Sequence, residues 1–210
     1  MQVFKKTQLS YLFLGASALA IVGLITLFIL TSKTEFGEKT PRNFSELGGG
    51  FTLQSAKGNV SLSDFKGKAV VMYFGFMNCP EVCPNSMGVL QSAFNRLSAD
   101  ELKSVHGIMI SIDPERDNVK SLEKFTQYYH TQIIGLTGSD DAVEKTADQY
   151  GAYFKRTKDK ENDYLFEHVS RYYVIDQQGN LVDALRHSTT PNELTAKLRE
   201  TLNQQTLALQ

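Results

Sequence analysis

Residues 69–84 read AVVMYFGFMNCPEVCP and place two cysteines directly after a strand candidate. The first six of these residues form a continuous apolar run of β-forming side chains, which is typical of a strand buried on both faces. From Pro84 the pattern becomes helical, because Met87, Leu90 and Phe94 recur at helical spacing. Proline suits the first turn of a helix, where its missing N–H costs nothing. The stretch therefore predicts a strand, a cysteine-bearing turn and a helix.

Strands and helices alternate along the rest of the chain. The strand candidates are Ile108–Ile112, Ile133–Leu136, Arg171–Ile175 and Leu181–Leu185, and helix candidates begin at Asp117 or Asn118, at Asp140 or Asp141, and at Pro191. Residues 176–180 read DQQGN and predict a hairpin turn between the last two strands. This order indicates an α/β fold, and we expect a mostly parallel sheet with an antiparallel edge. In such sheets ligands bind beyond the carboxyl ends of the strands, where the cysteine turn lies.

A long apolar segment precedes this domain. Leu9 to Leu30 is almost entirely apolar, and no charged residue lies between Thr7 and Ser32. A helix of this length spans about 33 Å, which matches the core of a bilayer and favours an uncleaved anchor over a cleaved signal peptide. We expect the short N-terminal tail to stay inside and the rest of the chain to be exported. No Arg- and Ser-rich presequence precedes the span, so a bacterial plasma membrane fits better than an organelle.

The 210 residues therefore divide into a tail and transmembrane anchor (1–32), a linker (33–48) and an exported domain (49–210). Basic residues number 22 and acidic residues 23, so no basic excess is available to bind nucleic acid. A hydrophobic content of 41% argues against a disordered class. Two cysteines are too few for a disulfide-stapled scaffold or a four-cysteine zinc site.

Cys79 and Cys83 lie four residues apart at the amino end of the predicted helix. The helix dipole and the free backbone N–H groups stabilise anions there, so we expect both thiols to ionise more readily than usual. Two adjacent thiolates favour either a disulfide or a soft metal ion such as Cu(I), with zinc as a competitor. A structural disulfide is the alternative, but so short a loop removes little entropy from the unfolded chain. A functional role is therefore favoured.

A third metal ligand would most simply be a histidine. The chain has four, His106, His130, His168 and His187. His168 follows a polar stretch from Lys158 to Asp163, and a loop there can reach the cysteine turn. His106 is expected to begin a strand, and His130 and His187 are expected to be exposed. Spacing alone leaves His168 an open candidate, because a lone histidine is usually structural or solvated.

The segment Asp113-Pro114-Glu115-Arg116-Asp117 follows another strand candidate and belongs to the same edge of the sheet. One interpretation is a turn fixed by the proline and a helix capped by Asp117. The other is that an aspartate at this edge accepts a hydrogen bond from a ligand histidine and orients its ring. The residues alone favour the cap.

Five motifs in order carry a resemblance to a known family. They are Gly49–Leu53, Phe74-Gly75-Phe76 leading into Cys79–Pro84, Ser111–Asp117, Gly135–Gly138 and Asp163–His168. With these motifs the chain resembles the Sco/SenC family of membrane-anchored copper proteins, from about Phe44 to its carboxyl end. The resemblance implies a thioredoxin-like fold, with a central mixed sheet flanked by helices and one transmembrane helix before it.

The resemblance also implies a copper site, for Cu(I), Cu(II) or both. It assigns Cys79, Cys83 and His168 as ligands and implies that Asp113 helps to shape the site. The implied function is delivery of copper to the dinuclear CuA centre of cytochrome c oxidase, or maturation of that centre. The implied partners are the CuA-bearing subunit and a copper donor or thiol reductant.

Two other functions remain open, a membrane-anchored thiol–disulfide reductase that keeps the client's cysteines reduced, and a redox or copper sensor. Reductases of the thioredoxin type usually have Cys-x-x-Cys after a tryptophan, whereas this chain has longer spacing and no tryptophan. It also has no proline between Pro114 and Pro191, where such enzymes place a cis-proline loop. Phe76 stands where a peroxiredoxin has threonine. A metallochaperone is therefore favoured over an enzyme.

Overall fold

The structure is a computed structural model and describes Gly23 and residues 43–158 and 164–208. Residues 43–210 form one compact unit. Within the described part of the chain, no helix is both long and apolar enough to cross a membrane. The predicted span from Leu9 to Leu30 lies outside the described residues, apart from Gly23, and so does most of the predicted linker.

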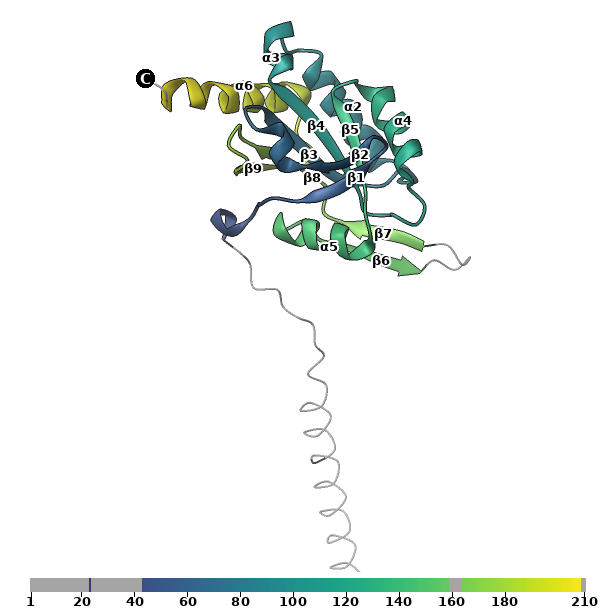
Figure 1. Cartoon of the computed structure of the whole chain (residues 1–210). Coiled ribbons are helices and arrows are strands. Elements are labelled where there is room, and N and C mark those ends of the chain that lie inside the picture. Colours follow the sequence, from purple (N-terminus) through teal and green to yellow (C-terminus); the bar gives the residue numbers. More distant parts are fainter. Residues whose placement is uncertain (1–22, 24–42, 159–163, 209–210) are drawn as a thin grey trace, which may run out of the picture. The chain divides into compact units, whose positions relative to one another are not determined.

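The core of the domain is a five-stranded sheet with the order β5-β4-β3-β8-β9 (Figure 1). Its strands are β3 (Ala69–Gly75), β4 (Val105–Ser111), β5 (Ile133–Leu136), β8 (Arg171–Ile175) and β9 (Leu181–Arg186). Strand β4 runs parallel to β3 and β5, whereas β8 runs antiparallel to β3 and β9. The expected α/β class and mixed sheet are confirmed.

The expected antiparallel edge is confirmed as the β8–β9 hairpin, but it makes two of the four pairings antiparallel, so parallel pairings do not outnumber antiparallel ones. Parallel neighbours need a crossover connection, usually a helix. Between the helix after β5 and strand β8, the chain instead runs through a separate hairpin. It then enters the sheet beside β3 from the opposite end, and the predicted turn at residues 176–180 returns it as β9.

The helices are α2 (Val82–Phe94), α3 (Ala99–Lys103), α4 (Val119–Tyr129), α5 (Asp140–Gln149) and α6 (Pro191–Ala208). Helix α2 packs against α6 and α4. Helix α4 is capped by Asn118, whose side chain accepts a hydrogen bond from the Ser121 N–H at 3.0 Å. Of the two residues expected at this helix start, Asn118 is confirmed as the cap, and the interpretation of Asp117 as the cap is wrong, because its side chain points into the protein.

Aromatic side chains show which helix covers which face of the sheet. Tyr73 and Tyr172 face α2, and the Tyr172 hydroxyl donates to a main-chain oxygen of that helix at 2.9 Å. Phe74 and Tyr173 point to the other face, where both rings pack against Tyr150 at the end of α5. Successive side chains of a strand point to opposite faces. Helices α2 and α5 therefore cover opposite faces of the sheet (Figure 1).

Two antiparallel hairpins lie outside the central sheet and were not expected from the sequence. The first pairs β1 (Thr52–Ser55) with β2 (Gly58–Ser61), and the second pairs β6 (Phe154–Lys158) with β7 (Tyr164–His168). His168 ends β7, opposite Phe154. The expectation that His168 lies in a loop is therefore wrong, because its segment pairs with β6 along its whole length.

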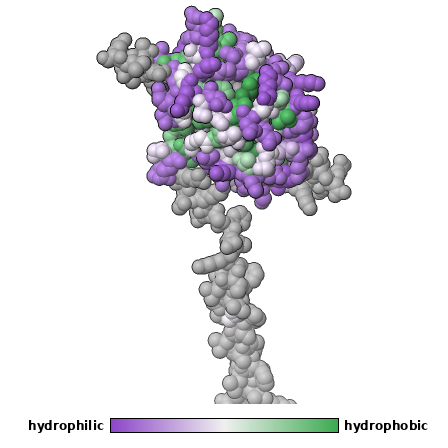
Figure 2. All heavy atoms as spheres, in the orientation of Figure 1, coloured by the Kyte–Doolittle hydropathy of each residue, from purple (hydrophilic) through white to green (hydrophobic). Residues whose placement is uncertain are grey.

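The face of the domain seen in Figure 2 is mostly hydrophilic, with hydrophobic side chains between. Among the described residues, the exposed large hydrophobic side chains are Phe44, Val82, Tyr128, Tyr153 and Val169. Two of them, Val82 and Val169, directly adjoin predicted metal ligands in the sequence. Positions directly next to Cys83 and His168 in the sequence are therefore exposed.

Candidate metal centre

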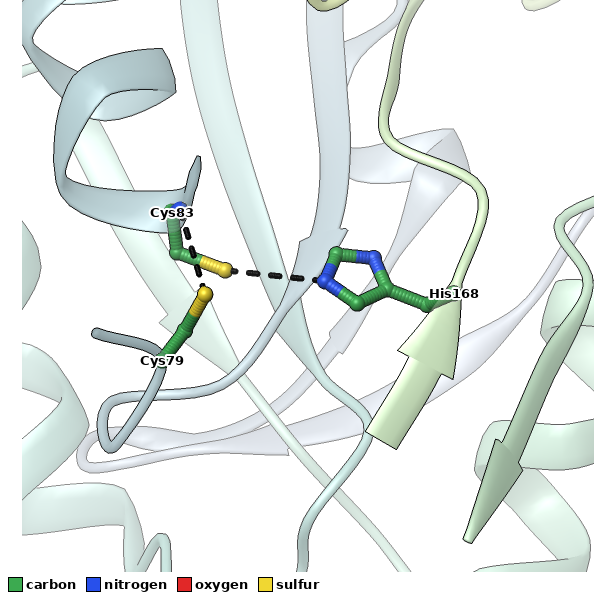
Figure 3. Close-up of side chains that lie close together, drawn as sticks. All are labelled: Cys79, Cys83 and His168. Atoms are coloured by element: carbon green, nitrogen blue, oxygen red, sulfur yellow. Dashed lines mark hydrogen bonds between the residues drawn. The ribbon is translucent and has the colours of Figure 1, made fainter. Parts of the chain in front are cut away.

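The three predicted ligands come from separate elements and converge (Figure 3). Cys79 lies in the loop after β3, Cys83 in the first turn of α2 and His168 at the end of β7. Their ligand atoms all lie within 4.8 Å of one another. The described residues contain no other group of three or more His, Cys, Asp or Glu side chains placed to hold a metal ion. The fold thus brings together residues that are 85 positions apart.

The two sulfur atoms are sheltered from solvent and unpaired by a disulfide. The backbone N–H of Cys83 donates to Cys79 Sγ at 3.4 Å, and Cys83 Sγ lies 4.0 Å from His168 Nε2 (Figure 3). Cys79 is 7% exposed and Cys83 is fully buried, whereas His168 is half-buried. The imidazole and the Cys79 sulfur therefore form the side of the site nearer to solvent.

The two thiols differ in pKa because their surroundings differ. A hydrogen bond from the Cys83 thiol, aided by backbone N–H groups, lowers the pKa of Cys79 to about 5. The pKa of Cys83 is raised, because that thiol shares its proton with the Cys79 sulfur and because it is buried. The expectation that both thiols ionise readily is confirmed for Cys79 and wrong for Cys83. In the metal-free protein the pair therefore holds one thiolate and one thiol at neutral pH.

The loop that carries Cys79 is fixed from behind by a buried carboxylate. Asp117 is 1% exposed, and its Oδ2 accepts hydrogen bonds from the Met77 N–H at 2.9 Å and from the Ser111 hydroxyl at 2.6 Å. Ser111 ends β4, so this carboxylate ties the loop to the edge of the sheet. Burial raises the pKa of Asp117. The sequence did not predict that Asp117 holds the cysteine loop, and its only signal was the polar motif Asp113–Asp117.

Asp113 lies at the same edge and is fully buried. Its side chain pairs with Arg116, and its backbone N–H donates to the Ser111 hydroxyl at 3.1 Å. The second ring nitrogen of His168, Nδ1, lies 3.3 Å from the hydroxyl of Ser170. The influence of Asp113 on the site stays a prediction.

The other three histidines lie outside this cluster. His106 is the second residue of β4, and its Nε2 lies 3.1 Å from Lys68 Nζ. His187 is exposed, as expected. His130 is half-buried with its ring 5.4 Å from that of Phe94, so the expectation of exposure is wrong for this residue. The end of α4 packs that ring against α2.

The hairpin that carries His168 is attached by aromatic and ionic contacts. The Phe166 ring packs 5.2 Å from that of Phe76, which follows β3. Arg156 on β6 pairs with Glu115 at 3.0 Å and with Asp140 at 3.6 Å. The hairpin is therefore joined to the cysteine-bearing loop, to the segment after β4 and to α5.

Two sulfur donors and one imidazole nitrogen form a donor set that suits copper. Soft thiolates select Cu(I), and imidazole also suits Cu(II) and zinc. The three donors lie within 4.8 Å of one another, and the imidazole among them is half-buried. The residues present therefore fit a copper ion.

Two thiols and an imidazole brought together in a thioredoxin-like domain are typical of metal-binding and thiol-redox proteins. The SCO1/SenC family model matches residues 39–203, and the chain belongs to this family. The family resemblance seen in the sequence is thereby confirmed.

A mouse relative, the mitochondrial protein SCO2 homolog, is 32% identical over 154 residues, which cover 72% of this chain and 60% of the mouse protein. The solved structure of Bradyrhizobium japonicum ScoI with copper bound is 30% identical with a TM-score of 0.68, covering 74% of this chain and 99% of that one. BsSco, studied for a disulfide switch and described as a member of the Sco family of cytochrome c oxidase assembly proteins, is 26% identical with a TM-score of 0.61. That match covers 79% of this chain and 99% of BsSco.

Proposed function

We propose that this chain is a copper chaperone that delivers copper to, or matures, the CuA centre of cytochrome c oxidase. Cys79, Cys83 and His168 hold one copper ion as cargo. The convergence of these three side chains within 4.8 Å carries the proposal. The copper-bound relative from Bradyrhizobium japonicum and the description of BsSco as an oxidase assembly protein support it.

Ligand exchange is the simplest route for the transfer. The client, the CuA-bearing subunit, supplies thiolates of its own, and each incoming thiolate replaces one ligand of the donor. A coordination position left open by the three protein ligands allows the first client ligand to bind before any donor ligand leaves. Soft thiolates on both partners keep the Cu(I) ion in a similar environment throughout, so the exchange needs no large change in metal affinity.

The proposed location is a bacterial plasma membrane. Residues 1–32 form the tail and a single transmembrane anchor, 33–48 a linker and 49–210 the copper domain on the outer side. The uncharged apolar run from Leu9 to Leu30 supports this division, as does a family match that begins after the run. An anchored donor would share the membrane with the oxidase that it serves.

Copper binding to the reduced full-length chain tests the proposal. The wild-type protein is expected to bind one copper ion per chain, and His168→Ala is expected to weaken Cu(II) binding more than Cu(I) binding, because two thiolates already satisfy the softer ion. His187→Ala, which changes an exposed histidine outside the cluster, serves as the matched control. Equal affinities in the wild-type protein and His168→Ala would remove His168 from the site.

The low pKa of Cys79 favours a second candidate, a thiol–disulfide reductase. A thiolate beside a second thiol can attack a disulfide of the client. Cys79 and Cys83 would then form a disulfide, and the two electrons and one proton that they lose would reduce the client's disulfide to one thiolate and one thiol. Such a role predicts no tightly held copper and a disulfide that is easily reduced. Loss of oxidase assembly in the double variant Cys79→Ser, Cys83→Ser, partly rescued by added copper, would favour delivery.

A further inference from the structure

A buried hydroxyl lies behind the metal site and connects two of its proposed ligands. The Tyr73 hydroxyl lies 3.8 Å from Cys83 Sγ and 3.3 Å from the hydroxyl oxygen of Ser170. Ser170 in turn lies 3.3 Å from Nδ1 of His168, whose Nε2 faces Cys83 Sγ at 4.0 Å. The four side chains therefore form a closed ring of contacts, to which Cys79 does not belong.

In the contacts of Ser170 with Tyr73 and with His168 either partner can donate, and one of the two directions around the ring leaves Nε2 of His168 without a proton. A neutral histidine carries one ring proton, and each hydroxyl donates one hydrogen bond and accepts up to two. If Nδ1 of His168 donates to Ser170, the Ser170 proton is free for the Tyr73 oxygen and the Tyr73 proton for Cys83 Sγ. Ser86 also hydrogen-bonds the Tyr73 hydroxyl, and the Tyr73 oxygen can accept this bond at its second acceptor position. Every polar atom of this hydrogen-bonded ring then has a partner.

We propose that Tyr73 and Ser170 are positioning residues that fix the ring proton of His168 on Nδ1 and place a hydrogen-bond donor on Cys83 Sγ. The proposal deepens the proposed copper function and rests on it for its biological meaning. With the proton on Nδ1, the Nε2 lone pair is free and faces the sulfur atoms. One hydrogen-bonded chain thereby leaves the His168 Nε2 lone pair free for a metal ion and places a donor on Cys83 Sγ.

The burial of Tyr73 supports this role. The side chain is 0% exposed on the central strand, and a buried hydroxyl without a partner is costly. Burial raises the pKa of Tyr73 above its usual range, so the phenol keeps the proton that it donates. Tyr172 on the neighbouring strand is equally buried but directs its hydroxyl to the main chain of α2. The contact with Cys83 is therefore specific to Tyr73.

The first test needs no copper. The full-length chain, labelled with 15N-histidine and reduced, contains four histidines that NMR can resolve. We expect His168 of the wild-type protein to be protonated on Nδ1 when neutral. Ser170→Ala removes the acceptor and is expected to shift the population toward the Nε2-protonated tautomer, whereas Ser170→Thr keeps the hydroxyl and the wild-type tautomer. Protonation of wild-type His168 mainly on Nε2, or no shift in Ser170→Ala, would overturn the proposal.

The second test follows the sulfur. Tyr73→Phe removes the hydrogen bond to Cys83, so the thiolate-to-Cu(II) charge-transfer band is expected to move to lower energy and copper affinity to fall by about 10-fold. Tyr173→Phe is the matched control, because Tyr173 is equally buried and its hydroxyl has no hydrogen-bond partner among the described residues. Unchanged spectra and affinity in Tyr73→Phe would leave the chaperone role standing and exclude the hydrogen-bonded chain. A wild-type chain that binds no copper would instead contradict the proposed function, and the tautomer measurement would still decide this inference.

Discussion

A β-carbon built on Gly75 would lie 2.8 Å from the sulfur atom of Cys83 and 2.7 Å from the Tyr73 ring. Gly75 ends β3, the central strand, and Cys83 lies in the first turn of α2. The missing side chain lets the sulfur pack directly against the end of the strand. The position of one proposed metal ligand therefore depends on a residue that contributes no donor atom.

Gly75→Ala is expected to lower the free energy of unfolding by about 1–3 kcal/mol, because the added methyl overpacks a filled space. It should also weaken copper binding, because Cys83 Sγ must move. Denaturant unfolding and copper titration measure the two effects. Gly88→Ala in α2 is the control, since nothing lies within 4 Å of its added β-carbon and a helical Gly→Ala change stabilises by about 0.5–1 kcal/mol. Wild-type values in Gly75→Ala would show that the sulfur tolerates displacement.

The acidity of the thiols predicts the order in which they react. Because the pKa of Cys79 is lowered to about 5, its thiolate predominates above that pH and is lost as the pH falls through it. The raised pKa of Cys83 keeps that group a thiol in the same range. Brief treatment of the reduced, metal-free chain with iodoacetamide at pH 7 should therefore label Cys79 first, as read by peptide mass spectrometry.

The largest cause of the low Cys79 pKa is the hydrogen bond from the Cys83 thiol, so Cys83→Ala should move the midpoint of Cys79 labelling to higher pH. Preferential labelling of Cys83 in the wild-type chain would contradict the assignment.

Asp117→Ala is expected to lower the free energy of unfolding by about 2–3 kcal/mol, because it leaves the Met77 N–H and the Ser111 hydroxyl without their buried acceptor. The loop before Cys79 should loosen as well, which weakens copper binding. Denaturant unfolding and copper titration again provide the measurements. Asp141→Ala, an exposed carboxylate in the first turn of α5, should cost less than about 1 kcal/mol. Equal losses in the two variants would argue against a special role for Asp117.

Arg156→Ala should act locally, on the hairpin that carries His168. Ion pairs with partly exposed partners contribute little to global stability, so the free energy of unfolding should change by less than about 1 kcal/mol. Amide hydrogen exchange in β6 should nevertheless become several-fold faster, because the contacts with Glu115 and Asp140 are lost. Lys155→Ala, an exposed neighbour on the same strand, should leave exchange unchanged. Similar acceleration in both variants would mean that the ion pairs do not hold the hairpin.

The central sheet was largely predictable from the sequence, because most of its strands are rich in apolar residues and the apolar residues of its helices recur at helical spacing. The β6–β7 hairpin was not, since Phe154–Lys158 reads FKRTK and carries three basic residues in five. Such a strand exists because β7 pairs with it and Phe166 packs on the core. The antiparallel β8–β9 hairpin was anticipated, but its place beside β3 was not, because strand order depends on the connections and not on apolar alternation.

The proposed ligands could be identified from the sequence only by family resemblance, since spacing alone left His168 open. The cysteine turn followed from local pattern, because one strand and one helix position both sulfurs. The roles of Asp117, Tyr73 and Ser170 depend on contacts between segments far apart in the chain. The sequence around Tyr73 does not distinguish it from the other buried tyrosines. Only the packing of β3 against α2 shows that its hydroxyl contacts Cys83.

The two cysteines belong to the segment around the central sheet, whereas the histidine belongs to an accessory hairpin 85 residues further along the chain than Cys83. An ion held by all three would act as a removable cross-link between the two parts. It would be present only in the folded chain, so loading at a metal concentration 100 times the dissociation constant would add about 2.7 kcal/mol to stability. The loaded chain would then resist heat and proteolysis better than the empty one, and its delivery state could be followed by its melting temperature alone.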